Sequence, residues 1–308
     1  QRLIVMKILL ATEKPFSAAA VGGIKDIVTG AGHELALLEK YTDKSQLLAA
    51  VSDAEAIIIR SDKITAEVIA AAPKLKIVVR AGAGYDNVDL VAATDRGIVV
   101  MNTPGQNSNA VAELAIAMAI YMARNQFNPG TGSEIAGKRM GCHAFGNIGK
   151  LVARYAHGFG MTVYASGRRP ITDPECDHPL ATAEELYKVS DVLSIHLPST
   201  DQTRGMVGRS LLSLLPKGAI VVNTARKEVI NEAELMAVLE ERPDLKYATD
   251  VKPDNYDALR EKFGNRVFAT PKKMGAETAE ANINAGLAAA RQIVGFFATG
   301  DTTFQVNK

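Results

Sequence analysis

Short runs of apolar residues alternate along the chain with longer segments in which apolar positions recur at helical spacing. Buried parallel strands joined by crossover helices produce this pattern, because helices then cover both faces of the sheet. The first set of runs predicts strands at 6–11, 34–38, 56–59, 76–79 and 98–101. The second set predicts strands at 139–143, 161–165, 192–196, 219–223, 247–250 and 267–269. The expected fold class is α/β, with two doubly wound parallel-sheet domains.

A turn-rich stretch, Asn-Thr-Pro-Gly-Gln-Asn-Ser-Asn at 102–109, separates the two sets, and an apolar helix is expected over 110–125. The last helical pattern, at 277–298, is long and apolar enough to return to the first domain and pack on it. We therefore expect a discontinuous first domain made of residues 1–102 plus 285–308. The second domain would then comprise residues 103–284.

Composition narrows the class of protein. Hydrophobic residues make up 47% of the 308 and charged residues 22%, which suits a globular chain of two domains. The 35 Lys and Arg nearly balance the 34 Asp and Glu, so no overall field favours nucleic acid or an anionic membrane. The longest apolar stretches are too short to cross a bilayer. We expect small-molecule partners, no nucleic acid and no membrane.

The two cysteines, Cys142 and Cys176, provide neither a disulfide framework nor a metal-binding spacing. They fit a reducing compartment, and we expect a cytoplasmic location. The histidines outside the motifs below show no ligand spacing either, so no metal site is expected.

A dinucleotide-binding turn is predicted after strand 139–143, where the sequence reads Ala144-Phe-Gly-Asn-Ile-Gly149 and a helical pattern follows. Gly146 would let the backbone approach a pyrophosphate, and Gly149 would let the helix pack closely on the strand. The N–H groups at the start of the helix would bind the phosphates. Ala144 replaces the first glycine of the usual GxGxxG motif, and a purely structural turn is the alternative. The expected cofactor residues here are Phe145, Gly146, Asn147, Ile148 and Gly149.

The next strand ends in Ser166-Gly167-Arg168-Arg169 and lacks the acidic residue that binds the ribose hydroxyls of NAD. Without that carboxylate a 2′-phosphate is not repelled, and Ser166 and Arg168 could donate hydrogen bonds to it. We therefore favour NADP(H), bound by Ser166, Gly167 and Arg168, with NAD(H) possible. In the alternative, the arginines form a solvated turn that selects neither cofactor.

Six further motifs occur in order along the chain: Val79-Arg-Ala-Gly-Ala-Gly-Tyr-Asp-Asn87, Asn102-Thr-Pro-Gly105, Asn109-Ala-Val-Ala-Glu-Leu114, His196-Leu-Pro198, Asn223-Thr-Ala-Arg226 and Thr270-Pro271. Together they resemble the D-2-hydroxyacid dehydrogenases, most of all a lysine-type branch of D-3-phosphoglycerate dehydrogenases without a regulatory domain. The resemblance implies a flavodoxin-like substrate domain, a Rossmann cofactor domain and a cleft between them. It also implies hydride transfer between a nicotinamide and C2 of a 2-hydroxy acid, and a homodimer built around the helix expected over 110–125.

Arg226 is expected to be catalytic. Its forked guanidinium would bind the substrate carboxylate and the C2 oxygen and polarise the carbonyl, whereas a surface arginine is the alternative. The backbone N–H groups of Ala81, Gly82 and Ala83 could hold the carboxylate, because small residues permit close approach. A sharp turn without a ligand is the alternative there.

Arg60, Ser61 and Arg80 follow two buried strands, at the ends where ligands of open α/β sheets bind. Two arginines exceed what a plain hydroxy acid requires, which favours a phosphorylated substrate such as 3-phosphoglycerate. Ordinary solvated arginines are the alternative.

The segment 270–278, Thr-Pro-Lys-Lys-Met-Gly-Ala-Glu-Thr, departs from the family. In the family a histidine after Thr-Pro is the general acid and base, oriented by a glutamate some twenty residues earlier. Lys273 takes the histidine position, next to Lys272, and Asp254 lies near the place of the glutamate. A lysine pKa of about 10.4 would have to be lowered by burial or by Arg226. In the alternative, Lys273 attracts the anionic substrate and water relays the proton.

The resemblance also implies that Asp250 holds the nicotinamide carboxamide. Further residues expected to line the cofactor are His196, Leu197, Pro198, Thr224 and Ala225. The favoured function is reversible oxidation of 3-phosphoglycerate, the entry to serine biosynthesis. The alternatives are a hydroxypyruvate or glyoxylate reductase and a non-catalytic nucleotide-sensing regulator.

Overall fold

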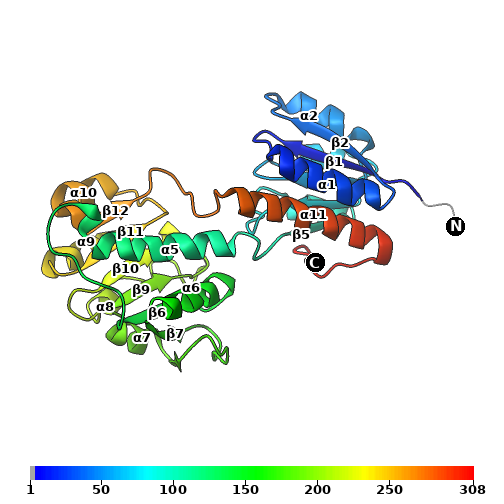
Figure 1. Ribbon diagram of the computed structural model, residues 1–308. Coiled ribbons are helices and arrows are strands. Elements are labelled where there is room, and N and C mark those ends of the chain that lie inside the picture. The colour runs from blue at the N-terminus through cyan, green and yellow to red at the C-terminus, as the bar shows by residue number, and fades with distance from the viewer. Residues whose placement is uncertain (1–3) are drawn as a thin grey trace. The chain divides into compact units, whose positions relative to one another are not determined.

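The computed structural model describes residues 4–308; residues 1–3, part of the expected first domain, lie outside the described residues. The chain divides into two compact units. The first unit consists of Gln1–Asn107 and Glu277–Lys308, and the second consists of Ser108–Ala276. Residues 4–107 and 277–308 therefore belong to the first unit, blue to cyan and red in Figure 1. The last helix, α11 (Ala279–Thr299), lies wholly in this unit, although the expected boundary at 284 would have cut it.

The first unit contains a five-stranded parallel sheet in the order β2-β1-β3-β4-β5. Its strands are β1 (Lys7–Thr12), β2 (Glu34–Glu39), β3 (Ala56–Ile59), β4 (Ile77–Arg80) and β5 (Val99–Asn102). Its helices are α1 (Ala18–Gly30), α2 (Lys44–Ala50), α3 (Ala66–Ala70), α4 (Leu90–Asp95) and α11. Each helix begins after a residue whose side chain accepts a backbone N–H: Ser17, Asp43, Thr65, Asp89 and Thr278.

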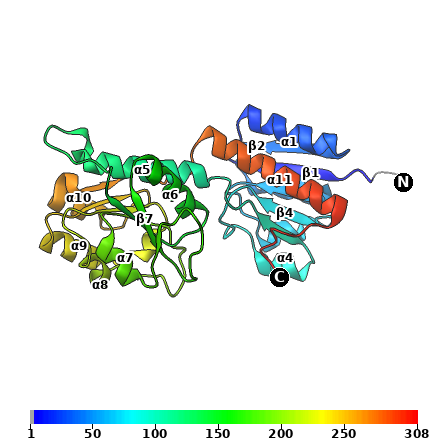
Figure 2. The same cartoon turned by 60° about the horizontal axis from the view of Figure 1, so that its bottom comes forward.

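Strand β3 shows why this unit has two cores. All four of its residues are buried, and alternate side chains point to opposite faces of the sheet. Ile57 and Ile59 join a cluster with residues of α2 and α3, whereas Ile58 joins a cluster with residues of α1 and α11. Helices α1 and α11 lie side by side in Figures 1 and 2, in agreement with that second cluster.

The second unit contains a seven-stranded parallel sheet in the order β12-β11-β10-β9-β6-β7-β8. Its strands are β6 (Arg139–His143), β7 (Thr162–Ser166), β8 (His178–Pro179), β9 (Val192–Ile195), β10 (Ile220–Asn223), β11 (Lys246–Thr249) and β12 (Val267–Ala269). The strand order reverses direction at β6 and β9, and ligands of doubly wound sheets bind at such a switch point.

Helices cover both faces of this second sheet. On one face, α5 (Ser108–Ala123) and α6 (Asn147–Gly158) share a core cluster with β6 and β7. The other face is covered by α7 (Ala183–Val189), α8 (Arg209–Leu212), α9 (Glu232–Glu241) and α10 (Tyr256–Phe263). Both units thus confirm the predicted α/β class with doubly wound parallel sheets.

Every predicted strand is present, and each end lies within one residue of its expected place. Strand β8 was not predicted, because its two residues are exposed at the edge of the sheet and carry no apolar pattern. The helix expected over 110–125 ends at Ala123, and Asn125, Gln126 and Phe127 then take left-handed φ values of 53°, 57° and 60°. The buried Gln126 side chain holds this turn by donating to the carbonyls of Asn265 and Val267 at 3.0 and 3.2 Å.

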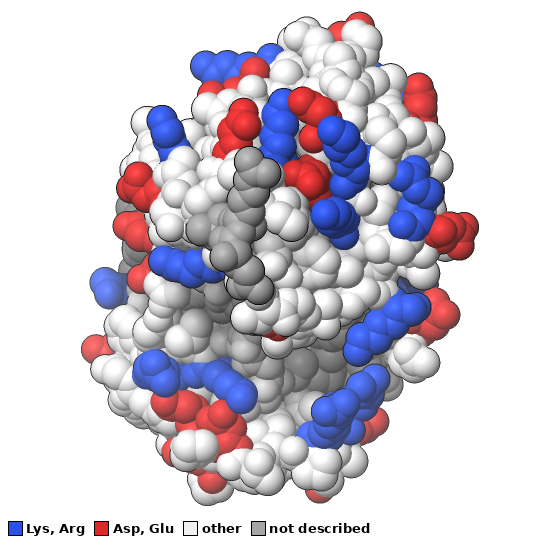
Figure 3. All heavy atoms as spheres, turned by 90° about the vertical axis from the view of Figure 1, so that its right-hand side faces the viewer, with Lys and Arg blue, Asp and Glu red and all other residues white. Residues whose placement is uncertain are grey.

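Surface charge has no dominant sign. On the face seen in Figure 3, basic and acidic side chains lie among one another, in keeping with a net charge of +1. In residues 4–308 we find no helix long and apolar enough to cross a bilayer.

Candidate functional site

The turn between β6 and α6 has the geometry of a phosphate-binding turn. A Cβ on Gly149 would lie 2.8 Å from the carbonyl oxygen of Ala144, so this position requires glycine. A Cβ on Gly146 would meet nothing within 4 Å, which leaves the space before the helix open. Helix α6 begins at Asn147 without a side-chain cap, so its N-terminal N–H groups can bind an anion. These features fit a bound pyrophosphate.

Ala144 occupies the position of the first glycine in the usual motif, and this replacement has a conformational cost. Its φ is 75°, in the left-handed region, where a residue with a Cβ is less stable by about 1 kcal/mol. The Ala144 N–H donates to the carbonyl of Ser166 at 2.8 Å, which ties the turn to the end of β7. The fold therefore keeps the turn although the first glycine is missing.

A pocket of about 850 Å³ opens beside this turn, at the carboxyl ends of β6, β7 and β9. Five expected cofactor residues line it: Ser166, Gly167, Arg168, Leu197 and Pro198. Ser166 is buried, whereas Arg168 is exposed and forms no hydrogen bond or ion pair within residues 4–308. A neighbouring pocket of about 300 Å³ is lined by Phe145 together with Gly167 and Arg168.

A third pocket, of about 190 Å³, brings further residues expected near the cofactor together with Arg226. Its lining consists of Ile148, His196, Leu197, Pro198, Thr224, Ala225 and Arg226. The hydroxyl of Thr224 is buried and has no hydrogen-bond partner among residues 4–308. An unsatisfied buried hydroxyl is costly, so this group is suited to a ligand.

Both histidines near these pockets are neutral at pH 7. Burial, followed by repulsion from His143, lowers the pKa of His196 to about 3. Burial lowers the pKa of His143 to about 4, and its Nδ1 lies 2.9 Å from the hydroxyl of Tyr187. A neutral imidazole with a pKa this low is a poor proton donor. His196 is therefore poorly suited to replace the missing catalytic histidine.

Arg226 is presented by a turn that Asn223 fixes at the end of β10. The buried Asn223 side chain accepts from the N–H of Ala225 at 3.0 Å and donates to the carbonyl of Arg226 at 3.0 Å. The exposed guanidinium of Arg226 donates to the carbonyl of Ala225 at 2.8 Å. The backbone of the turn is thus fixed, and Arg226 lines the third pocket.

Asp250, just after β11, holds the loop that carries the two lysines. Its buried carboxylate accepts hydrogen bonds from the hydroxyl of Thr270 and from the N–H groups of Met274 and Gly275, at 2.8, 2.9 and 2.8 Å. Lys272 and Lys273 lie between these anchors, and both side chains are exposed. The structure therefore places Lys273 at the carboxyl edge of the sheet without burying it.

Asp254 is engaged away from this loop. Its carboxylate pairs with the ammonium of Lys227 at 2.8 Å, and this hydrogen bond raises the pKa of Lys227. The Asp254 side chain is 79% exposed. It therefore shows no sign of orienting a proton-transfer group in place of the missing glutamate.

The first unit contains the expected arginine pair. Arg60 donates to Asn282 of α11 at 3.0 Å, and its guanidinium lies 5.1 Å from the centre of the Phe16 ring. The Nε atom of Arg80 is buried without a partner among the described residues, and burial and then the charge of Arg60 lower the pKa of Arg80. Two mutually repelling guanidiniums favour an anion beside them. Ser61, next to Arg60, is exposed.

The expectation for the N–H groups at this turn needs correction for Ala81 and Gly82, whereas for Ala83 it stays a prediction. The Ala81 N–H donates to the carbonyl of Ile59 at 2.8 Å, and the Gly82 N–H donates to the hydroxyl of Thr103 at 2.8 Å. Both donors are therefore occupied inside the protein and cannot hold a carboxylate. Gly82 has φ of 151°, and a Cβ there would collide with the Arg80 guanidinium, so glycine makes room for that side chain.

Comparison with known proteins decides the family. The catalytic-domain model of the D-isomer-specific 2-hydroxyacid dehydrogenases matches residues 10–307. This chain belongs to that family. It is 47% identical to a structurally characterised, NAD⁺-bound 3-phosphoglycerate dehydrogenase of Entamoeba histolytica, with 99% of each chain covered and a TM-score of 0.86.

Other relatives of this 2-hydroxyacid dehydrogenase carry two different names. A hydroxypyruvate reductase of Thermotoga maritima is 36% identical over 278 residues, covering 82% of this chain and 88% of the relative. A D-3-phosphoglycerate dehydrogenase of Methanocaldococcus jannaschii is 34% identical over 302 residues, covering 88% of this chain and 57% of the relative. The chain spans about half the length of the curated phosphoglycerate dehydrogenases it matches. The predicted family and enzyme class are confirmed.

Several residues of this dehydrogenase line the pocket of about 850 Å³ although the sequence did not point to them. They come from two segments, Ala181–Glu184 at the start of α7 and the loop after β9: Ala181, Thr182, Ala183, Glu184, Thr200, Gln202, Thr203 and Met206. Neither segment carries a motif, and both reach the pocket only because the sheet brings their strands together. No group of His, Cys, Asp and Glu suited to a metal ion occurs within residues 4–308.

Proposed function

We propose that this dehydrogenase catalyses the reversible oxidation of 3-phosphoglycerate to 3-phosphohydroxypyruvate, as in serine biosynthesis. The proposal rests on two neighbouring cations, Arg60 and Arg80. The Nε of Arg80 is buried and has no partner among residues 4–308, and the charge of Arg60 lowers the pKa of Arg80. A substrate with a phosphate as well as a carboxylate supplies the charge that this pair and Arg226 require. The 47% identity to a relative named 3-phosphoglycerate dehydrogenase supports the same substrate.

Each residue then has one task. Arg226 binds the carboxylate and the C2 oxygen, and Arg60 and Arg80 bind the phosphate. A nicotinamide bound in the second unit would supply the hydride chemistry at C2. Lys273 takes the proton of the C2 hydroxyl during oxidation and donates it to the C2 oxygen during reduction. Because Lys273 is exposed, the substrate and cofactor must displace the water around it.

We favour NADP(H) as the cofactor. Strand β7 ends in Ser166 and is followed by Gly167 and Arg168, so no carboxylate stands where the ribose hydroxyls of NAD are held. The exposed Arg168 guanidinium is available to a 2′-phosphate. NAD(H) is the second candidate, because the Entamoeba relative is NAD⁺-bound. Phe145, Gly146, Asn147 and Gly149 would hold the pyrophosphate with either cofactor.

Reduction of hydroxypyruvate or glyoxylate is the second candidate function. It is favoured by the 36% identity to a hydroxypyruvate reductase of which the chain covers 88%. We also propose a homodimer built around α5 and a cytoplasmic location, for which sedimentation and cell fractionation are the direct tests.

A kinetic panel tests the substrate. Purified protein is assayed with 3-phosphoglycerate, glycerate, glyoxylate and hydroxypyruvate, each with both cofactors, and the panel is repeated with Arg80→Ala. We expect the highest kcat/KM with the phosphorylated acid, and we expect Arg80→Ala to lower that value at least about tenfold more than the values for unphosphorylated acids. Equal losses on all substrates would contradict a phosphate site. Higher kcat/KM on glyoxylate or hydroxypyruvate would favour the reductase.

A further inference from the structure

Three donors converge on Asp250, and all come from one loop. Its Oδ1 accepts from the Thr270 hydroxyl and from the Met274 N–H, and its Oδ2 accepts from the Gly275 N–H. The carboxylate is 1% exposed, so water does not compete for these bonds. The segment between the outer anchors contains Pro271, Lys272 and Lys273. A single carboxylate thus binds both ends of the segment 270–275, here called the lysine loop.

Hydrogen bonds between the ends of β11 and β10 connect this loop to the turn of Arg226. The Asp250 N–H and the Thr249 hydroxyl both donate to the carbonyl of Asn223, at 3.0 and 2.9 Å. The Asn223 side chain in turn fixes the backbone of Arg226. All these contacts lie within the second unit. Asp250 is therefore hydrogen-bonded both to the loop of Lys273 and to Asn223, which fixes the turn of Arg226.

The local sequence fits a carboxylate at this place. Ionised Asp accepts hydrogen bonds only, whereas an Asn side chain would turn an NH₂ group toward a backbone N–H that needs an acceptor. A Cβ on Gly275 would lie 3.0 Å from Asp250 Oδ2 and 3.2 Å from Val111 Cγ2. Glycine at 275 thus permits the close approach that the hydrogen bond to Oδ2 requires.

We propose that Asp250 is a positioning residue for proton transfer: by holding Thr270, Met274 and Gly275 it fixes the loop on which Lys273 acts. This role is separate from the nicotinamide contact expected of the same side chain. The inference rests on the proposed function of Lys273. It predicts that loosening the loop lowers proton transfer without weakening cofactor binding.

Thr270→Val is the decisive variant, because it removes one loop bond and leaves the carboxylate in place for a cofactor. Ser190→Ala is the matched control, since it removes an equally buried hydroxyl that donates to the carbonyl of Leu186 and forms no bond to the loop. Amide hydrogen exchange of the segment 271–276, whose exchangeable amides are those of residues 272–276, is measured in the protein without ligands. Cofactor Kd, kcat and the pH profile of kcat are measured in parallel.

For Thr270→Val we expect amide exchange at 271–276 at least about fivefold faster than in the control, from the loss of one hydrogen bond. We expect kcat to fall about threefold to tenfold with a changed pH profile, while the Kd of NADPH and NADH stays within about twofold. Asp250→Asn should loosen the loop further; if it fails to fold, Thr270→Val decides alone.

Two results would overturn the inference. Unchanged exchange at 271–276 would show that Asp250 does not fix the loop, and this readout needs no substrate. Faster exchange with normal kcat and pH profile, or a loss confined to cofactor Kd, would show that the fixed loop does not serve proton transfer. Failure of the proposed function itself is distinguished by the unmodified protein, which would then turn over none of the acids while the exchange result still stands.

Discussion

At the scale of single residues, the proposed preference for NADP(H) depends on the charge at the end of β7. Gly167 follows Ser166 directly, and a Cβ on Gly167 would lie 3.8 Å or more from its neighbours. A side chain can therefore be added there without displacing the backbone. Its charge would act on the pocket that Ser166 and Arg168 line.

Gly167→Asp should raise the Kd of NADPH at least about tenfold relative to that of NADH, because a carboxylate repels a 2′-phosphate and accepts from ribose hydroxyls. Gly167→Asn has the same shape without the charge and should leave the ratio within about twofold. Titration of both cofactors by fluorescence measures the ratio. If Asp leaves it unchanged, the argument for NADP(H) fails.

Single residues also show which features of the site could be predicted from the sequence. The glycine requirement at 149 follows from a local motif, and the structure supplies the carbonyl of Ala144 that enforces it. The N–H groups of Ala81 and Gly82 could not be judged in this way. Their acceptors, Ile59 and Thr103, lie about twenty residues away and become neighbours only when the strands pair. Hydrogen-bond donors are thus predictable from sequence only where their partners are local.

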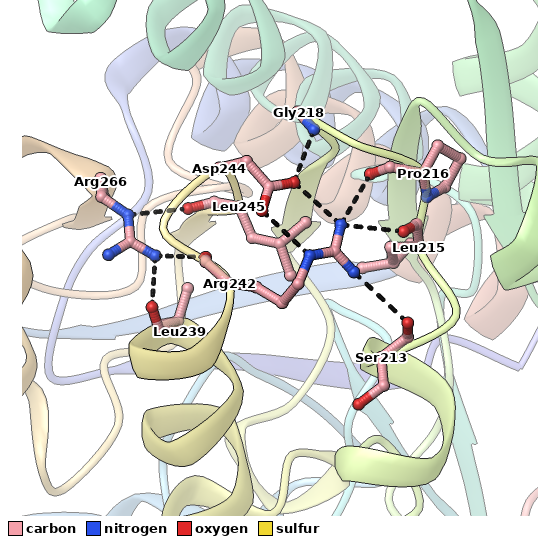
Figure 4. A network of polar contacts seen from close by, with 9 residues as sticks. All are labelled: Ser213, Leu215, Pro216, Gly218, Leu239, Arg242, Asp244, Leu245 and Arg266. Carbon is pink, nitrogen blue, oxygen red and sulfur yellow. Dashed lines mark hydrogen bonds and ion pairs between the residues drawn. The ribbon is translucent and has the colours of Figure 1, made fainter.

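At the scale of elements, two arginines bind backbone carbonyls at the amino ends of strands of the second sheet, whereas the pockets lie at the carboxyl ends (Figure 4). Arg242 pairs with Asp244 at 2.8 Å and also donates to the carbonyls of Leu215 and Pro216. Arg266 donates to three further carbonyls at this edge, those of Leu239, Arg242 and Leu245. The hydrogen bond from Arg242 is the main cause that lowers the pKa of Asp244 below its ordinary value.

Asp244→Asn should reduce the free energy of unfolding at pH 7 by about 1–2 kcal/mol, the range for a charged hydrogen bond at a partly exposed site. A carboxylate whose pKa is lowered by folding stabilises the fold above its unfolded pKa and loses that effect as the pH falls. The difference between the two proteins should therefore shrink below about pH 4.

Thermal unfolding at pH 7 and at about pH 3, below the unfolded pKa of Asp, measures this difference. Asp257→Asn is the control, since Asp257 is 97% exposed and lies 3.8 Å from Lys252. A difference between Asp244→Asn and the native protein that stays the same at both pH values would contradict the assigned role of the ion pair.

Element prediction failed where tertiary contacts override local preference. The left-handed turn at 125–127 contains Gln126 and Phe127, which rarely adopt positive φ, and it depends on bonds from Gln126 to a segment some 140 residues later. The strands inside each sheet were predictable because they are buried on both faces and therefore apolar, whereas β2, at the edge of its sheet, has no fully buried residue.

At the scale of the whole molecule, two doubly wound units provide the residues for one proposed reaction. The first unit supplies Arg60 and Arg80, and the second supplies the pockets, Arg226 and the lysine loop. The family and its motif order could be predicted from the sequence. The lysine position followed from that order as well, but its anchoring by Asp250 appeared only with the folded sheet, because the anchor and the loop belong to different strand ends.

The most direct test of the account is the turnover of Lys273→Ala compared with Lys272→Ala, the adjacent exposed lysine. If Lys273 transfers the proton, its removal should lower kcat by about 10²- to 10⁴-fold, with cofactor Kd nearly unchanged and partial rescue by an added small amine. Lys272→Ala should keep kcat within about threefold of normal. Normal turnover in Lys273→Ala, or an equal loss in both variants, would contradict the account.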